Sequence, residues 1–242
     1  MIFSRFKASF SQAPRWFQWG WAMVVLAILA LRFWDLQAYA WGYDELSAVF
    51  RAMQAKDWHA HLHQGVAVDG HPAGLQTLIW LWIGANGADV FIPRLFTALV
   101  SVGVLWQLHG MAKRHFDVET AYWAVCLMGL MWWQAGMSIW IRPYVFGLPF
   151  VLWSWDLVLG VLKHRNGQGD VMLPERIGLF SLKLGGALAG AAYIHYFAGL
   201  TAGASFIALL LLQPKIKPNP SNHTQGLHPS YILFLPVTFA FL

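Results

Sequence analysis

Long charge-free apolar stretches constrain this chain more than any other feature of its sequence. Residues 120–141 contain no Asp, Glu, Lys or Arg, and residues 16–31 contain none either. A helix that crosses the hydrocarbon core of a bilayer needs about 20 apolar residues. Only 11% of the 242 residues are charged, which is less than half the roughly 25% usual in soluble domains. The sequence therefore predicts an all-α polytopic membrane protein.

We expect about six to seven transmembrane helices within one membrane domain. The stretch between Arg176 and Lys215 is too long for one crossing and slightly short for two, which predicts a tight helical hairpin turning near His195. The final apolar run is too short to cross, so we expect a chain truncated at its C-terminus. The expected spans are residues 15–34, 93–112, 119–139, 143–162, 177–194 and 197–213, with a partial seventh span at 230–242.

The basic residues indicate the orientation of these spans. Segment 72–86 would reach only about 22 Å as a helix, short of the roughly 30 Å hydrocarbon core, so we interpret it as an interfacial helix. Eleven of the 16 Lys and Arg residues then fall on one side, which is the cytoplasmic side by the positive-inside rule. This predicts a cytoplasmic N-terminus and a large, acidic outer loop over residues 35–92 with interfacial helices. The net charge of +5 is thus mostly a topology signal and predicts no nucleic-acid binding.

Two adjacent carboxylates, Asp44 and Glu45, follow the first expected span. Carboxylates in an apolar setting suit proton abstraction or cation binding. The pair also suits helix capping, with Asp44 as the N-cap of a helix over residues 45–56. The apolar face of that helix would carry Leu46, Val49, Phe50 and Met53. The two interpretations are compatible, and the sequence leaves both open.

Other polar residues of the outer segments are candidate binding groups. His71 lies in an Asp-Gly-His-Pro turn that opens the interfacial helix, and it suits either substrate binding or a turn. Arg94 and Arg142 stand at the outer ends of spans, where an arginine binds phosphate or extends its stem to the headgroup layer. His195 lies among aromatic residues, which are also typical of the membrane interface.

Metal and disulfide chemistry have weaker support in the sequence. The single cysteine, Cys126, excludes an internal disulfide and a thiolate cluster. His59, His61 and His63 would share one face on a strand but spread apart on a helix, so they favour no metal site. Asp156, within a span, is expected to pair with a polar group of a neighbouring helix.

Six short motifs, each weak alone, follow one another along the chain at consistent membrane positions. They are Gly42-Tyr43-Asp44-Glu45, Asp69-Gly70-His71-Pro72, Ile92-Pro93-Arg94-Leu95, Ala112-Lys113-Arg114-His115-Phe116, Ile141-Arg142-Pro143-Tyr144 and Ile194-His195-Tyr196-Phe197. Their order resembles the GT-C class of membrane glycosyltransferases, in the branch that holds protein O-mannosyltransferases and the lipid A aminoarabinose transferase. The resemblance covers residues 15 to 213.

The resemblance implies an inverting transferase of the cell membrane, of the bacterial inner-membrane type, with its site on the outer face. Its donor would be a polyprenyl-phosphate-linked sugar, and its acceptor a hydroxyl of a lipid, glycan or protein. No cofactor is certain, and a divalent metal is compatible with the class. Asp44 would be the general base with Glu45 beside it, and Arg142 would contact the phosphate. The other expected substrate-binding residues are His71, Arg94, Tyr144, His195 and Tyr196.

Two departures from the family pattern leave other functions open. Ala73 stands where the family usually has a second proline after His-Pro, and family members are commonly much longer than this chain. A lipid or solute transporter or flippase is one alternative, with Asp44, Arg142 and Asp156 along its pathway. A catalytically inactive truncated remnant is another.

Overall fold

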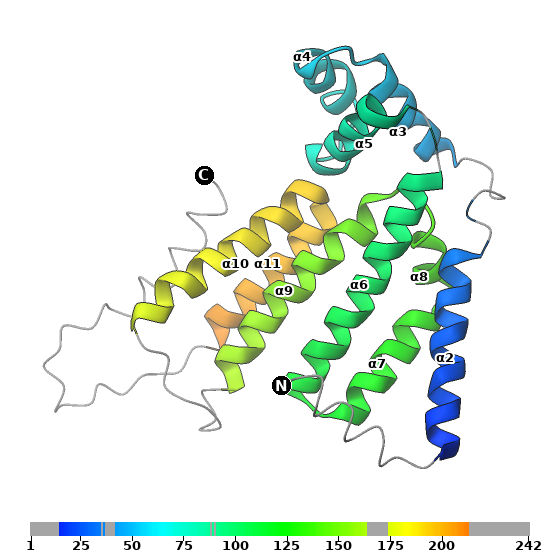
Figure 1. Cartoon of the computed structure of the whole chain (residues 1–242). Helices are drawn as coiled ribbons and strands as arrows, with labels where there is room; N and C mark the ends of the chain where they lie inside the picture. Colours follow the sequence, from blue (N-terminus) through cyan, green and yellow to red (C-terminus); the bar gives the residue numbers. More distant parts are fainter. Residues whose placement is uncertain are drawn as a thin grey trace, which may run out of the picture.

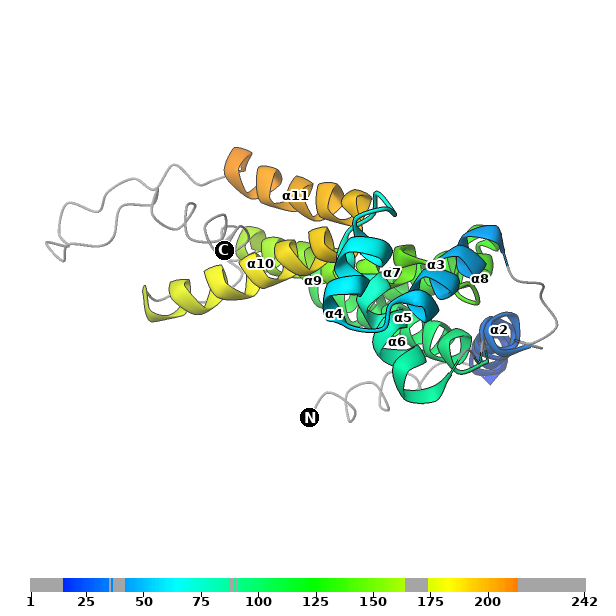
Figure 2. The same cartoon turned by 90° about the horizontal axis from the view of Figure 1, so that it is seen from above.

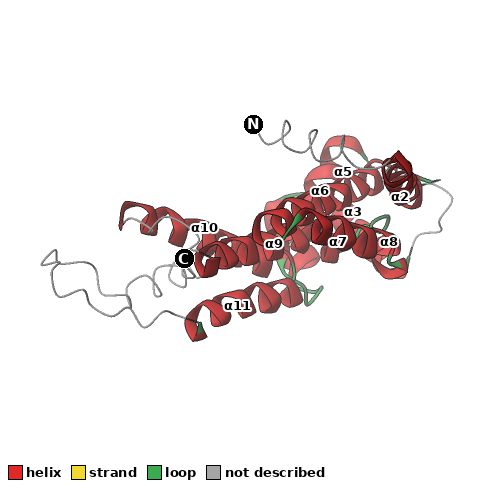
Figure 3. Ribbon diagram, turned by 90° about the horizontal axis from the view of Figure 1, so that it is seen from below, coloured by secondary structure: helices red, strands yellow, loops and turns green. Residues whose placement is uncertain are grey.

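The computed structural model describes residues 15–34, 36, 42–87, 89, 91–163 and 174–212. Within these residues all regular structure is helical and no strand occurs (Figure 3). This confirms the all-α prediction. The expected partial span at 230–242 lies outside the described residues.

Six helices lie side by side in a row (Figure 1). α9 lies at the centre and packs against α6, α10 and α11, while α6 packs against α7, and α7 against α2. The six helices are α2 (Arg15–Phe33), α6 (Phe91–His115), α7 (Val118–Leu130), α9 (Pro143–Lys163), α10 (Pro174–Ile194) and α11 (Tyr196–Leu211).

Shorter helices cover one end of this row (Figures 1 and 2). They are α3 (Tyr43–Gln54), α4 (Trp58–Ala60), the π-helix η1 (His61–Val66) and α5 (Ala73–Asn86), with α8 (Trp132–Met137) at the same end. α5 lies outside the row, with Pro72 as its N-cap. The turn between α10 and α11, which is His195, lies at this end too.

Two helices, α6 and α9, are long and apolar enough to cross a membrane, over Phe91–His115 and Pro143–Leu162. The 25 residues of α6 extend about 37 Å at 1.5 Å per residue, which exceeds a hydrocarbon core of roughly 30 Å. The apolar segments of the other helices in the row have 10–17 residues. The structure thus agrees with a membrane protein in these two helices.

The stretch expected as one span over 119–139 is divided into α7 and α8 at Met131. Met131 has an extended backbone, with φ −59° and ψ 123°. The break exposes carbonyls of the last turn of α7, and the carbonyl of Gly129 accepts a hydrogen bond of 2.9 Å from Nη1 of Arg32. Arg32 is fully buried and also donates to Ser101 Oγ at 2.9 Å. A cation at this helix end is favoured by the helix dipole.

Asp156 of α9 pairs with the far end of α6. Its carboxylate contacts Arg114 Nη2 at 2.7 Å and His115 Nε2 at 2.7 Å. These residues are the neighbouring polar groups that the sequence predicts without naming. They fasten α6 to α9 at the end away from α3 and α5 (Figure 1).

An apolar core joins the short helices to the row. Gly74 of α5 lies so close to the α10 end that a Cβ there would be 2.7 Å from the Tyr193 carbonyl. A side chain at this position would push α5 away from the hairpin. The buried core residues are Ala48, Val49 and Ala52 of α3, Leu75 and Ile79 of α5, Ile141, Phe146 of α9 and Ile194 of α10.

Candidate functional site

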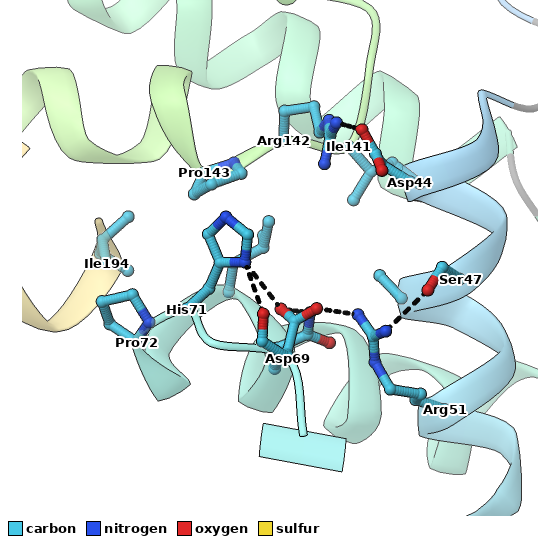
Figure 4. A pocket seen from close by; sticks show the side chains of 13 residues that line it. Asp44, Ser47, Arg51, Asp69, His71, Pro72, Ile141, Arg142, Pro143 and Ile194 are labelled. Atoms are coloured by element: carbon cyan, nitrogen blue, oxygen red, sulfur yellow. Dashed lines mark hydrogen bonds and ion pairs between the residues drawn. The ribbon is translucent and has the colours of Figure 1, made fainter. Parts of the chain in front are cut away.

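A small polar cavity lies where the short helices meet the row (Figure 4). Its volume is about 60 Å³, enough for about two water molecules at roughly 30 Å³ each in the liquid. The segments that meet there are α3, the turn before α5, the link between α8 and α9, and the end of α10. The polar lining residues are Asp44, Ser47, Arg51, Asp69, His71, Gln76 and Arg142.

An ion pair between Asp44 and Arg142 forms one wall of the cavity (Figure 4). Burial lowers the pKa of Arg142 from its ordinary value, but a guanidinium stays charged in proteins. The prediction that Asp44 is the N-cap of a helix over 45–56 is wrong. The helix begins at Tyr43 with Gly42 as its N-cap, and this shift places Asp44 in the first turn, on the side that faces Arg142.

Glu45 lies on the other side of α3, inside the protein. Its side chain is 1% exposed and pairs with that of Arg94, which is 0% exposed, at 2.7 Å. Its carboxylate also accepts hydrogen bonds from the backbone N–H groups of Ile141 at 2.9 Å and Gly42 at 3.2 Å. Neither Glu45 nor Arg94 lines the cavity. The predicted catalytic and substrate-binding roles of these two residues therefore have no geometric support in this arrangement.

The position of Glu45 nevertheless matters for the cavity. Because Glu45 follows Asp44 in α3 and bonds the residue before Arg142, one carboxylate fixes both members of the Asp44–Arg142 pair. Arg94 holds that carboxylate from α6 and also bonds the carbonyl of Leu36 at 3.0 Å. Buried charges require such pairing and hydrogen bonding. The Glu45–Arg94 pair is thus a support for the site.

Asp69 organises the opposite wall. Its carboxylate pairs with Arg51 of α3 and accepts a hydrogen bond of 2.7 Å from Gln76 Nε2 of α5. The same carboxylate lies 3.3 Å from His71 Nδ1. Arg51, Asp69 and Gln76 are absent from the residues predicted to form the site. The available signal was helical spacing, since Arg51 lies two turns after Asp44 and shares its face.

His71 reaches the cavity and stacks on His195 with ring centroids 6.0 Å apart. His195 is buried, and its Nδ1 accepts the Phe197 backbone N–H at 3.2 Å as the N-cap of α11. Burial, followed by the charges of His71 and Arg142, lowers the pKa of His195. Tyr144 packs edge-on against His195 at 4.9 Å. His195 and Tyr144 therefore lie behind His71 and do not line the cavity themselves.

Tyr196 is the one remaining predicted binding residue. It is the first residue of α11, and its side chain is exposed. It does not line the cavity. Of the eight predicted residues, the structure thus brings Asp44, His71 and Arg142 to the cavity and places Tyr196 outside it.

The apolar face expected on α3 points away from the protein. Val49 is buried, but Leu46, Phe50 and Met53 are more than half exposed. The buried side of α3 instead carries Glu45 and small residues. A helix with its apolar side chains outward and its charged groups inward is typical of one that lies at a membrane surface.

An apolar groove adjoins the polar cavity. It has a volume of about 450 Å³ and lies between α5 and the N-terminal ends of α6 and α9. Leu75 and Ile141 line both the groove and the cavity. The other groove residues are Leu78, Ile79, Leu81, Trp82, Pro93, Phe96 and Phe146.

Of the three alternating histidines, His61 is separated from the other two, and the three share no common face. His61 is buried, stacks on Trp80 at 4.9 Å and contacts Thr77 Oγ1 at 3.2 Å. His59 and His63 lie one helical turn apart on the surface with ring centroids 4.3 Å apart. Among the residues that the structure describes, no group of three or more His, Cys, Asp or Glu side chains could hold a metal ion.

Comparisons with known proteins identify no relative. A scan against protein-family models, a search of curated proteins and a search of solved structures each find no match for the chain. A function for this site therefore has to follow from its own residues and geometry.

Proposed function

We propose that this chain is an inverting membrane glycosyltransferase. It transfers a sugar from a polyprenyl-phosphate donor to an acceptor hydroxyl of a lipid, glycan or protein. In this proposal it crosses a cell membrane of the bacterial inner-membrane type about six to seven times, with its N-terminus in the cytoplasm. The polar cavity then faces the exterior.

The observation that carries the proposal is that Asp44, His71 and Arg142 line one cavity although almost 100 residues separate the first from the last. The set combines a carboxylate that can accept a proton with a guanidinium that can bind phosphate. A sugar phosphate is a good leaving group, so one base and one cation supply the main needs of a direct displacement.

The displacement assigns a role to each group. Asp44 takes the proton of the acceptor hydroxyl while the acceptor oxygen forms its bond to C1 of the sugar from the face opposite the phosphate. The bond between C1 and the phosphate oxygen breaks, and its electron pair stays on that oxygen. Arg142 stabilises the charge that develops on the departing phosphate.

The ion pair between Asp44 and Arg142 fits this chemistry. Asp44 is held by Arg142, and a carboxylate engaged by a guanidinium is a weak base. A donor phosphate would compete for the guanidinium with two or more oxygens. Binding of the donor therefore frees Asp44, so the base becomes active when the donor is in place.

The apolar groove supports a lipid-linked donor. An amphiphile with an anionic head and a hydrocarbon chain needs a cation beside an apolar channel. Arg142 lies in the cavity, and the groove of about 450 Å³ shares Leu75 and Ile141 with it. The exposed apolar residues of α3 would place this end of the molecule at the membrane surface.

A transporter or lipid flippase is the second candidate, and buried charge within the row favours it. Arg32 is fully buried between α2, α6 and α7, and ionisable residues inside a membrane domain commonly mark a pathway. This function moves the lipid without breaking the sugar–phosphate bond. A transfer assay therefore separates it from the first proposal.

The test is sugar transfer by the full chain in membrane vesicles supplied with radiolabelled polyprenyl-phosphate hexoses and pentoses. We expect wild type to release polyprenyl phosphate and Asp44→Asn to lose at least about 100-fold in rate, the lower end for a general base. The matched control is Asp57→Asn, which changes an exposed N-cap of the same segment and should leave the rate unchanged. Equal rates for wild type and Asp44→Asn would remove Asp44 as base. No transfer with any donor would reject the transferase.

A further inference from the structure

His71 has one ring nitrogen held and the other directed into the cavity. Nδ1 lies 3.1 Å from the backbone carbonyl of Asp69 and 3.3 Å from the Asp69 carboxylate. Both groups are acceptors, so Nδ1 carries a hydrogen. Figure 4 shows the other nitrogen, Nε2, on the side of the ring that faces Pro143 and Arg142. The described residues give Nε2 no hydrogen-bond partner.

Asp69 is itself fixed, which makes this orientation of His71 a built feature. Arg51 holds one carboxylate oxygen of Asp69, and Gln76 donates to the other at 2.7 Å. The backbone also turns sharply between Asp69 and His71, because Gly70 has φ +66°, a conformation that favours glycine. A carboxylate that orients an imidazole through Nδ1 is the arrangement that lets Nε2 transfer protons in hydrolases.

His195, stacked behind His71, is held in its neutral form. Its Nδ1 accepts a backbone N–H, which requires an unprotonated Nδ1, and burial lowers its pKa. The imidazole stacked behind His71 is therefore the neutral member of the pair. The charged groups facing His71 are Asp69 from its own turn, Arg51 and Asp44 from α3, and Arg142 from the link before α9.

We infer that His71, positioned by Asp69, is the general acid that protonates the departing phosphate of the donor; this inference rests on the proposed transferase function. A phosphate bound at Arg142 would lie between that guanidinium and His71, since both residues line the cavity. The anionic phosphate and the Asp69 carboxylate can each accept a hydrogen bond from a doubly protonated ring. The second pKa of a phosphate ester is about 6, so transfer from an imidazolium to the product phosphate is nearly balanced.

The step balances with Asp44 as base. As the bond between C1 and the phosphate oxygen breaks, its electron pair stays on oxygen, and Nε2–H of His71 passes its proton to the phosphate. The acceptor hydroxyl loses its proton to Asp44 at the same time. Asp44 then holds the proton of the acceptor hydroxyl, and water in the cavity can pass it on to His71, which has given its own proton to the phosphate. The donor phosphodiester and the hydrogen-phosphate product each carry one negative charge, so a turnover needs no other acid.

The test varies the leaving group. Two donors with the same sugar are compared, in which the lipid is joined to phosphorus through CH₂ or through CF₂. The fluorines withdraw electrons and make the departing phosphonate a weaker base, so the CF₂ donor needs less acid assistance. His71→Asn keeps a donor for Asp69 at the Nδ1 position and removes the group that faces the cavity. His59→Asn, on the surface of the same outer segment, is the control.

We expect His71→Asn to lower the transfer rate by about 100-fold or more with the CH₂ donor, and by less than about 5-fold with the CF₂ donor. Asp44→Asn should lower the transfer rate by the same factor with both donors, because the base acts on the acceptor hydroxyl and not on the leaving group. If His71→Asn lowers the transfer rate equally with the two donors, or with neither, His71 is not the general acid. Either result would leave the role of Asp44 and the transferase activity unaffected. A wild type inactive on both donors and also on polyprenyl-phosphate sugars would overturn the transferase as well.

Discussion

Replacing Glu45 with glutamine should destabilise the protein strongly although it alters few atoms. The Glu45 carboxylate is buried and accepts from Arg94 at 2.7 and 3.3 Å, from Ile141 at 2.9 Å and from Gly42 at 3.2 Å. An amide keeps one acceptor oxygen, removes the charge that balances Arg94 and turns donors toward donors. Breaking a buried ion pair from one side costs about 3–5 kcal/mol. We expect the free energy of unfolding to fall by that amount.

The measurement is equilibrium unfolding of the purified chain in mild detergent titrated with SDS, followed by tryptophan fluorescence. Glu119→Gln, which neutralises an exposed glutamate in the first turn of α7, should change the free energy by less than about 1 kcal/mol. A double variant, Glu45→Gln with Arg94→Met, should recover part of the loss because no buried charge remains. A loss for Glu45→Gln no larger than that of Glu119→Gln would refute the view that this pair supports the site.

Three further predictions concern packing and pH. The Cβ of Gly74→Ala would lie 2.7 Å from a backbone carbonyl of α10, so this variant should lower the free energy of unfolding by about 1–3 kcal/mol. The Cβ of Gly84→Ala, on the same helix, meets nothing within 4 Å, so this variant should raise the free energy of unfolding by up to about 1 kcal/mol. The SDS titration compares the two variants. Burial lowers the pKa of His195 below 6.5, so the unfolded chain takes up a proton at this residue at a higher pH than the folded chain does. The free energy of unfolding should therefore fall as the pH drops from about 7.5 to 5.5. His195→Asn, which can still cap the N-terminus of α11, should show a smaller fall. A backbone hydrogen bond lowers the pKa of Asp117 below 3.8. The stabilisation that Asp117 contributes is therefore present above pH 3.8 and is lost as the pH falls through the lower pKa of the folded state. In Asp117→Asn, the unfolding midpoint should fall less steeply as the solution is acidified.

The helical class could be predicted from the sequence because charge-free runs leave few alternatives in a bilayer. The helix boundaries could not. Met131 breaks the expected span at 119–139 without a proline or glycine at that position, and the bonds that accompany the break come from Arg32 of another helix. Such a tertiary contact has no signature within the broken segment itself.

For the site, too, part could be predicted from the sequence and part could not. Asp44, His71 and Arg142 stand out in the sequence because each lies in a short polar motif beside an apolar segment. The role of Glu45 depends on Arg94, 49 residues away, and that of Asp69 depends on Arg51, 18 residues away. Pairing between distant charges follows from how the segments pack, so a single sequence could supply the candidates without their partners.

The relative strength of the ion pairs on α3 explains how a small cavity could admit a large substrate. Asp44, Glu45 and Arg51 each pair with a different segment. Exposed ion pairs contribute about 0–1 kcal/mol, and the half-exposed Asp44–Arg142 pair is closer to that case than the buried Glu45–Arg94 pair, where removing one partner costs about 3–5 kcal/mol. An anionic ligand can therefore separate Asp44 from Arg142 while the buried pair keeps α3 in place. Opening then widens the cavity between the proposed base and the proposed phosphate site, where the sugar has to fit.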